Sequence, residues 1–187
     1  NLDWISESDK LDDGTGWDFP AEELPLSGKP FVFNSKNGPV SFRFPHKSAG
    51  AKNCVECRGQ KIVIPAGSRY KAIHILGAMH NGSSPVAFQL AYSKGLPRTV
   101  MLNFSDWWRG DPIYGEETVV KTTFHHEKSG EAQKKPGVGM YLQSIPLQEG
   151  PSAPDAGGQA GTPVSLTLPN DNRFRIFAIT LEEQERP

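Results

Sequence analysis

Aromatic and polar side chains that could together hold a sugar surround one dipeptide of the sequence, Trp107-Trp108. A sugar stacks its apolar C–H face on an aromatic ring, while carboxylate, amide and guanidinium groups satisfy its hydroxyl groups. The residue types at this stretch therefore indicate a binding site with chemistry that suits a sugar. The candidate ligand-binding residues are Trp108, Arg109, Asp106, Trp17, Asp18 and Tyr114.

The two adjacent indoles are expected to face opposite ways. Neighbouring side chains of a strand alternate between its faces, so at most one of the two rings can comfortably enter the core. We expect a β-bulge at Ser105-Asp106, because the chain begins to turn toward Gly110 there, and this bulge places Trp107 inside and Trp108 outside. The alternative is that Trp108 merely lies against a loop and binds no ligand.

Paired carboxylates are the candidate catalytic groups if this chain is an enzyme. Glutamates occur in three pairs, Glu22-Glu23, Glu116-Glu117 and Glu182-Glu183. Sequence neighbours point apart, whereas glycoside hydrolysis by two carboxylates needs groups that face one another across about 5 to 10 Å. We interpret the pairs as solvated surface charge. A glycoside hydrolase or polysaccharide lyase stays open as the alternative, with carboxylates that only the fold brings together.

Other catalytic patterns are weak in this sequence. His125-His126 resembles a proton-transfer or metal-ligand pair only superficially, since adjacent strand residues face opposite sides. No GxSxG, HExxH, GxGxxG or P-loop string occurs, which removes the easily recognised hydrolase and nucleotide-binding classes.

The cysteines form a single CxxC, Cys54 and Cys57, for which three interpretations are open. The preferred one is a local disulfide in a secreted protein, and the second is two separate thiols. The third is half of a metal site completed by His46, His74 or His80. A lone CxxC supplies only two of the four ligands of tetrahedral zinc, so we expect no zinc site here.

Composition places the chain in the all-β class. Its 187 residues include 19 glycines and 16 prolines, its net charge is −1, and no long helical periodicity occurs. Such a chain can bury a substantial core without metals or disulfides. The balanced charge argues against nucleic-acid and anionic-membrane partners, and no transmembrane run or secretory apolar region is present. Because the sequence begins with Asn1 rather than methionine, we expect a mature or excised fragment.

Short alternating runs predict about ten strands joined by turns, which describe an antiparallel β-sandwich or jelly roll. The central hairpin spans residues 88–104, and Asn37-Gly38 signals another hairpin. The nearly continuous apolar run at residues 70–77 is the expected centre of a sheet. The remaining strands are expected at residues 60–65, 118–125, 140–147, 164–168 and 174–181.

The expected domain organisation is one sandwich at residues 14–187 preceded by an arm at residues 1–13. The arm is polar and acidic, so we expect either a mobile segment or an edge segment that docks late. Residues 148–163 are rich in Gly, Pro, Ala and Ser and are expected to form a flexible insertion.

Several strand signatures carry a resemblance to a known kind of domain. They are FPAEELP, CRGQKIVIP, YKAIHILGA, a hairpin ending in SDWW, YLQSIPL and SLTLPNDNRFRIFAITLE. Over roughly residues 17–182 the chain resembles the galactose-binding-like β-sandwich domains appended to bacterial and fungal glycosidases. The insertion and the CxxC depart from that pattern.

The resemblance implies a secreted, non-catalytic carbohydrate-binding or accessory domain that binds oligo- or polysaccharide and works beside a catalytic glycosidase domain. A structural module that only packs on such a partner is the second alternative. The resemblance also implies a structural calcium ion, as domains of this kind often carry one. Its candidate ligands are Asp12, Asp13, Glu22 and Glu182, although no Asp-x-Asp-x-Asp-Gly loop fixes a geometry.

Overall fold

A computed structural model describes most of the chain. The described residues are 4–6, 17–48, 51–127, 132–133, 138–147 and 161–184. Most of the expected arm at residues 1–13 and of the expected insertion at residues 148–163 therefore lies outside them.

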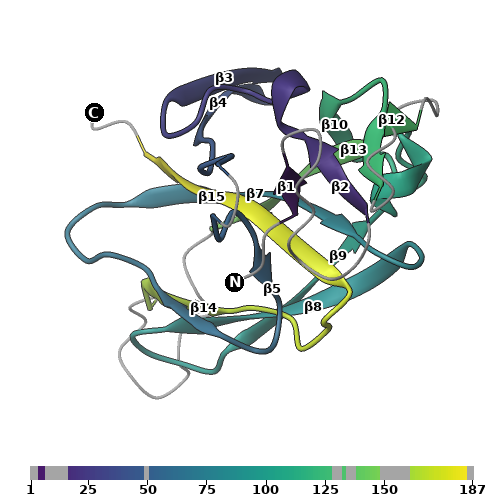
Figure 1. Cartoon of the computed structure of the whole chain (residues 1–187). Coiled ribbons are helices and arrows are strands. Elements are labelled where there is room, and N and C mark those ends of the chain that lie inside the picture. The colour runs from purple at the N-terminus through teal and green to yellow at the C-terminus, as the bar shows by residue number, and fades with distance from the viewer. Residues whose placement is uncertain are drawn as a thin grey trace.

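Two antiparallel sheets form a β-sandwich, as predicted (Figure 1). The first sheet contains, in spatial order, β10 (Glu117–Lys121), β13 (Gly139–Pro146), β7 (Tyr70–Met79), β15 (Phe174–Glu183) and β5 (Val55–Glu56). The second contains β6 (Lys61–Val63), β14 (Pro163–Thr167), β8 (Ser84–Tyr92) and β9 (Arg98–Phe104). In Figure 1 the yellow strand β15 crosses the middle of the molecule beside β7, and β8 and β14 lie below it.

Smaller elements cover the outer side of the first sheet and one end of the sandwich. One small sheet joins β1 (Ile5–Ser6), β2 (Trp17–Pro20), β11 (His125–Glu127) and β12 (Ala132–Gln133), and β1 runs parallel to β2. A separate hairpin joins β3 (Pro30–Ser35) to β4 (Gly38–Arg43), as the Asn37-Gly38 signal predicted. The helices of the described residues are two 3₁₀ turns, η1 (Ala21–Glu23) and η2 (Trp107–Arg109).

Strand β7 is the buried centre of the first sheet, which confirms the prediction for residues 70–77. Its residues from Ala72 to Met79 are all buried. The second sheet covers one face of β7. On the outer side, the neighbouring strand β15 contacts the hairpin of β3 and β4, since Thr180 Oγ1 donates a hydrogen bond of 2.7 Å to the Ser41 carbonyl oxygen. A strand covered on both faces is apolar at every position rather than at alternate ones.

The close packing of β7 and β15 requires a glycine. A Cβ atom on Gly77 would lie 2.8 Å from the Arg175 carbonyl oxygen and 2.9 Å from the Phe174 ring. The Phe174 ring in turn packs on Phe104, with 4.5 Å between ring centroids, and on Phe88 at 6.2 Å. Gly77 thus lets an aromatic cluster join the two sheets.

The described part of the N-terminal segment is an edge strand with buried anchors. Trp4 is 1% exposed and Ile5 is fully buried. The Trp4 indole stacks on Phe177 at 5.8 Å and packs edge-on against Phe19 at 5.6 Å. These residues therefore form a docked edge segment, which is the second of the two expectations for the arm, and not a mobile one.

The preferred disulfide interpretation of the CxxC is wrong, because Cys54 and Cys57 form no disulfide, and both are buried. They flank strand β5, and a strand advances about 3.3 Å per residue, so their Cα atoms are about 10 Å apart, beyond the 4.4 to 6.8 Å of a disulfide. Burial raises the pKa of the Cys57 thiol to about 12. The second interpretation, two separate thiols, is the one that the structure supports.

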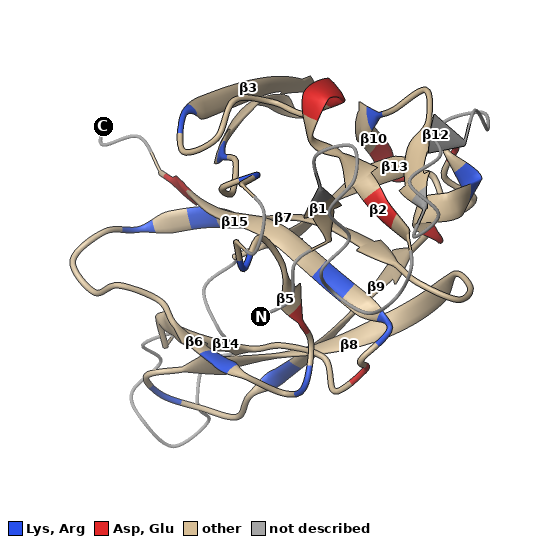
Figure 2. Cartoon of the chain, in the orientation of Figure 1, with Lys and Arg blue, Asp and Glu red and all other residues tan. Residues whose placement is uncertain are grey.

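Charged side chains are scattered over the molecule. In the view of Figure 2, the basic and acidic positions are spread over several strands and loops. This distribution agrees with the net charge of −1.

Candidate functional site

A capped 3₁₀ turn, and not a β-bulge, carries the two tryptophans. Strand β9 ends at Phe104 and η2 begins at Trp107. Asp106 Oδ1 accepts the backbone N–H of Trp108 at 2.9 Å, so Asp106 is the N-cap residue of this turn. The expected bulge is therefore wrong, because the aspartate offers the chain a local hydrogen bond that competes with the strand.

The turn still sends the two indoles in different directions. Trp107 is 2% exposed and confirms the expected inner position, with ring centroids 4.9 Å from Trp4 and 5.0 Å from Phe19. Trp108 is half-buried rather than fully outside, since its ring packs at 4.4 Å on His125 and at 6.1 Å on Trp17. Its removal would therefore disturb packing as well as any bound ligand.

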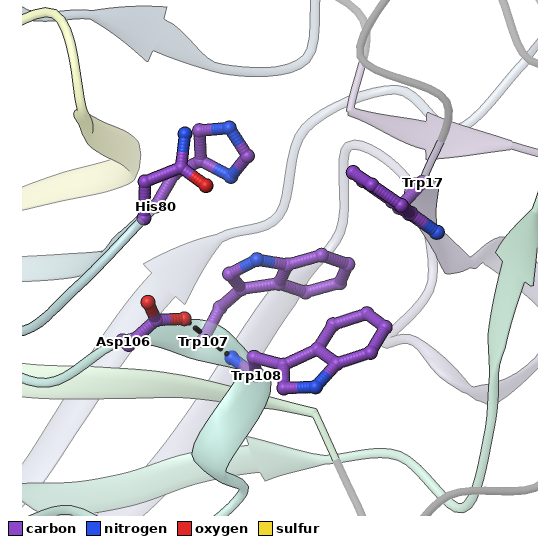
Figure 3. A pocket seen from close by; sticks show the side chains of 6 residues that line it. Trp17, His80, Asp106, Trp107 and Trp108 are labelled. Carbon is purple, nitrogen blue, oxygen red and sulfur yellow. Dashed lines mark hydrogen bonds between the residues drawn. The ribbon is translucent and has the colours of Figure 1, made fainter.

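These side chains line a pocket of about 270 Å³ that is open to solvent (Figure 3). It is lined by Trp17, His80, Asn81, Asp106, Trp107 and Trp108. Trp17 comes from the start of β2, His80 and Asn81 follow the end of β7, and the others belong to η2 and its cap. Figure 3 shows His80 and Asp106 on one side, Trp17 and Trp108 on the other, and Trp107 between them.

Backbone hydrogen bonds hold the polar side of the pocket in place. The second carboxylate oxygen of Asp106 accepts the backbone N–H of Gly82, and the Asp106 N–H donates to Ser83 Oγ at 2.8 Å. A parallel bridge joins Met79 to Asp106, which fixes the β7 end beside η2. Each carboxylate oxygen carries two lone pairs, so both can accept one further hydrogen bond from a ligand.

Three of the six predicted ligand-binding residues line this pocket, namely Trp17, Asp106 and Trp108. Asp18, the next residue along β2, is fully buried on the opposite face from the exposed Trp17. Arg109 is exposed at the end of η2 and does not line the pocket. Tyr114 is 40% exposed in the following loop, where its N–H donates to Glu116 Oε2 at 3.0 Å.

Two lining residues, His80 and Asn81, were absent from the predicted set. A weak signal for them exists, because Asn81-Gly82 is a turn that directly follows the buried central strand, and loops at strand ends often carry function. Asn81 adopts φ 60°, a left-handed conformation that asparagine tolerates better than most residues. Only the fold brings this turn against Asp106.

The glutamate and histidine pairs do not converge on the pocket. Glu116 is 6% exposed and its carboxylate accepts backbone N–H groups of Ser105 and Tyr114, so the interpretation as solvated surface charge is wrong for this residue. His125 packs on Trp108, whereas the His126 ring lies 3.2 Å from a Glu22 carboxylate oxygen. The two rings thus face opposite sides, as expected.

The expected calcium ligands are only partly described. Asp12 and Asp13 lie outside the described residues. Glu22 is engaged by His126, while Glu182 pairs with Lys71 at 2.8 Å and with His74 at 3.1 Å. The described fold does not bring these two glutamates into one site. Within the described ranges, no group of three or more His, Cys, Asp or Glu residues could hold a metal ion.

A second polar cluster joins three strands of the first sheet. His74 on β7 contacts Ser144 Oγ on β13 at 2.8 Å through Nδ1 and Glu182 on β15 at 3.1 Å through Nε2. Burial opposes ionisation of Glu182, but hydrogen bonds from Lys71 and His74 outweigh it and lower the pKa of its carboxyl. His74 lies on β7 six residues before His80, which at about 3.3 Å per residue is about 20 Å along the chain, and His74 does not line the pocket.

Comparison with known proteins identifies one family. The sequence model described as the AziU2-like beta-sandwich domain matches residues 1–185. The search of curated proteins finds no match. No helix of the described residues is long and apolar enough to cross a membrane.

Proposed function

The chain belongs to the AziU2-like β-sandwich domain family, and we propose that it is a non-catalytic carbohydrate-binding or accessory domain. The observation that carries the proposal is the pocket of three indoles with a carboxylate, an amide and an imidazole at its edge. Indole faces suit the C–H face of a sugar, and the polar groups suit its hydroxyls. The proposal follows the resemblance to galactose-binding-like domains, including their place in a secreted glycan-degrading system.

The size of the pocket supports recognition of a single sugar ring. Its volume of about 270 Å³ is slightly below the range of roughly 300 to 1,000 Å³ for pockets that enclose drug-sized ligands. We therefore propose that the pocket holds one residue of a glycan.

The composition of the pocket supports binding over hydrolysis. Asp106 is the only carboxylate among the described residues that line it. Hydrolysis by two carboxylates needs a second one across about 5 to 10 Å. The glycosidase alternative therefore lacks a partner for Asp106 in the described lining.

The test is a glycan array on the full chain, followed by calorimetric titration of the sugars that bind. Trp17→Ala should weaken binding by about tenfold or more, because it removes a stacking surface. Tyr114→Ala is the matched control, since Tyr114 is 40% exposed and Trp17 is 41% exposed, but only Trp17 lines the pocket. This control should bind as the parent does.

Two results would contradict the proposal. One is an array on which no glycan binds, which would leave the module that packs on a partner domain as the better hypothesis. The other is a Trp17→Ala variant with parental affinity, which would remove the pocket from the sugar site.

A further inference from the structure

We propose that the ligand of this pocket carries a protonated amine, as in a hexosamine with a free amino group. The inference rests on the proposed function, which it narrows to one class of sugar. It follows from the charge and the aromatic surface of the lining. Asp106 is the one acidic residue among the described lining residues, and no lysine or arginine is among them.

Accessible indole surface lies at the pocket, because Trp17 is 41% exposed and Trp108 is half-buried. The Trp17 and Trp108 ring centroids lie 6.1 Å apart with 68° between the ring planes, and Trp107 and Trp108 lie 5.5 Å apart, also at 68°. At these distances the rings contact each other edge to face, so a ligand meets the accessible indole surface of Trp17 and Trp108 and does not enter between the rings. A cation within about 6 Å of an indole face is attracted by the ring, and tryptophan is the best of the aromatic residues at this.

The Asp106 carboxylate is held in position before any ligand arrives. Its two oxygens accept the backbone N–H groups of Trp108 and Gly82, which lie on different segments of the chain. An ammonium group at the remaining lone pairs would form a charge-assisted hydrogen bond, which is stronger than a bond between neutral groups. Arg109, the nearest basic residue in sequence, is exposed and outside the lining.

A definite order of ligands follows from this arrangement. The ammonium group of a free amino sugar interacts with both the carboxylate and the indole faces. The neutral sugar of the same shape makes only hydrogen bonds and stacking contacts. N-acetylation removes the charge and adds bulk to a pocket of about 270 Å³. A uronic acid places a negative charge against Asp106 and should bind most weakly.

The experiment titrates the chain with the methyl glycosides of glucosamine, galactosamine, their N-acetylated forms, glucose, galactose and glucuronic acid. The amines should bind at least about tenfold more tightly than the neutral sugars. Asp106→Asn should remove this preference. Asparagine is as good an N-cap residue as aspartate, and the Gly82 N–H that loses its acceptor is exposed to water, so the fold should persist.

The matched control is Asp111→Asn. It removes the same unit of charge from a side chain that is 80% exposed and paired with Lys121 outside the pocket. This variant should keep the parental preference for amines. Equal affinity for amine and neutral sugars, or a preference that survives in Asp106→Asn, would overturn the inference.

Cyclohexylamine and cyclohexanol separate this inference from the sugar assignment. They share a ring and differ in charge, and neither is a sugar. If cyclohexylamine binds and no sugar does, the amine preference stands and the proposed function falls. If neutral sugars bind as well as amino sugars, the proposed function stands and the amine preference falls. If none of these probes binds, both are wrong.

Discussion

Trp107→Ala is the substitution that should damage the fold most directly at the candidate site. Trp107 is 2% exposed, and its indole lies 4.9 Å from the ring of Trp4, 5.0 Å from that of Phe19 and 5.5 Å from that of Trp108. A buried indole removes about 150 to 250 Å² from water, which is worth roughly 4 to 6 kcal/mol at 25 cal/mol per Å². Alanine keeps part of this burial, so the expected loss in free energy of unfolding is about 3 to 5 kcal/mol.

Urea unfolding followed by circular dichroism measures this loss. With a slope of about 2 kcal/mol per M, a loss of 4 kcal/mol moves the midpoint by about 2 M. Trp107→Phe keeps an aromatic ring, so its loss in free energy of unfolding should be clearly smaller. This variant can be measured even if Trp107→Ala does not fold. Tyr114→Ala, at an exposed position, should stay within about 0.5 kcal/mol of the parent. A Trp107→Ala loss below about 1 kcal/mol would refute the assignment of this ring to the core.

Two further predictions concern titrating groups. Cys54 and Cys57 should react with a thiol reagent only after denaturation, because both are buried and the pKa of Cys57 is raised to about 12; rapid modification of the native protein would contradict this. Glu182→Gln should lower stability at pH 7 by about 0.5 to 1 kcal/mol, with a difference that shrinks below pH 4. The pKa of Glu182 is lower in the folded state than the unfolded value of about 4.3. Its stabilising effect is therefore present above about pH 4.3 and is lost as the pH falls through the pKa of the folded state. Urea titrations at pH 7 and pH 3 check this, and a difference that grows in acid would be the wrong sign.

The fold followed from the sequence because the strands of this chain have the patterns that burial imposes. The alternation around residues 88–104 predicted a hairpin, and strands β8 and β9 occupy that stretch. The continuous apolar run at residues 70–77 predicted a central strand because only a strand covered on both faces tolerates it. These signals are local, so one sequence is enough to interpret them.

The candidate site was predictable only in part, because it depends on contacts between distant segments. Trp17 and Asp18 could not both face one pocket, because neighbouring strand residues point to opposite faces, but alternation alone does not say which of the two lines it. Asp106 in front of two tryptophans is also a local sign of a capped turn. His80 is different, since its place in the pocket follows from the bridge between Met79 and Asp106, which no local pattern predicts.

The order of the strands in the first sheet has a consequence for the synthesis of the chain. Strand β7 pairs with β15, so that His74 meets Thr180 about a hundred residues later, and pairing at such separation slows folding. Until residues 174–183 have been made, one edge of the most apolar strand has no neighbour. An open apolar edge is a template for pairing with other chains. We therefore expect association of incomplete chains during translation to be a misfolding route of this topology.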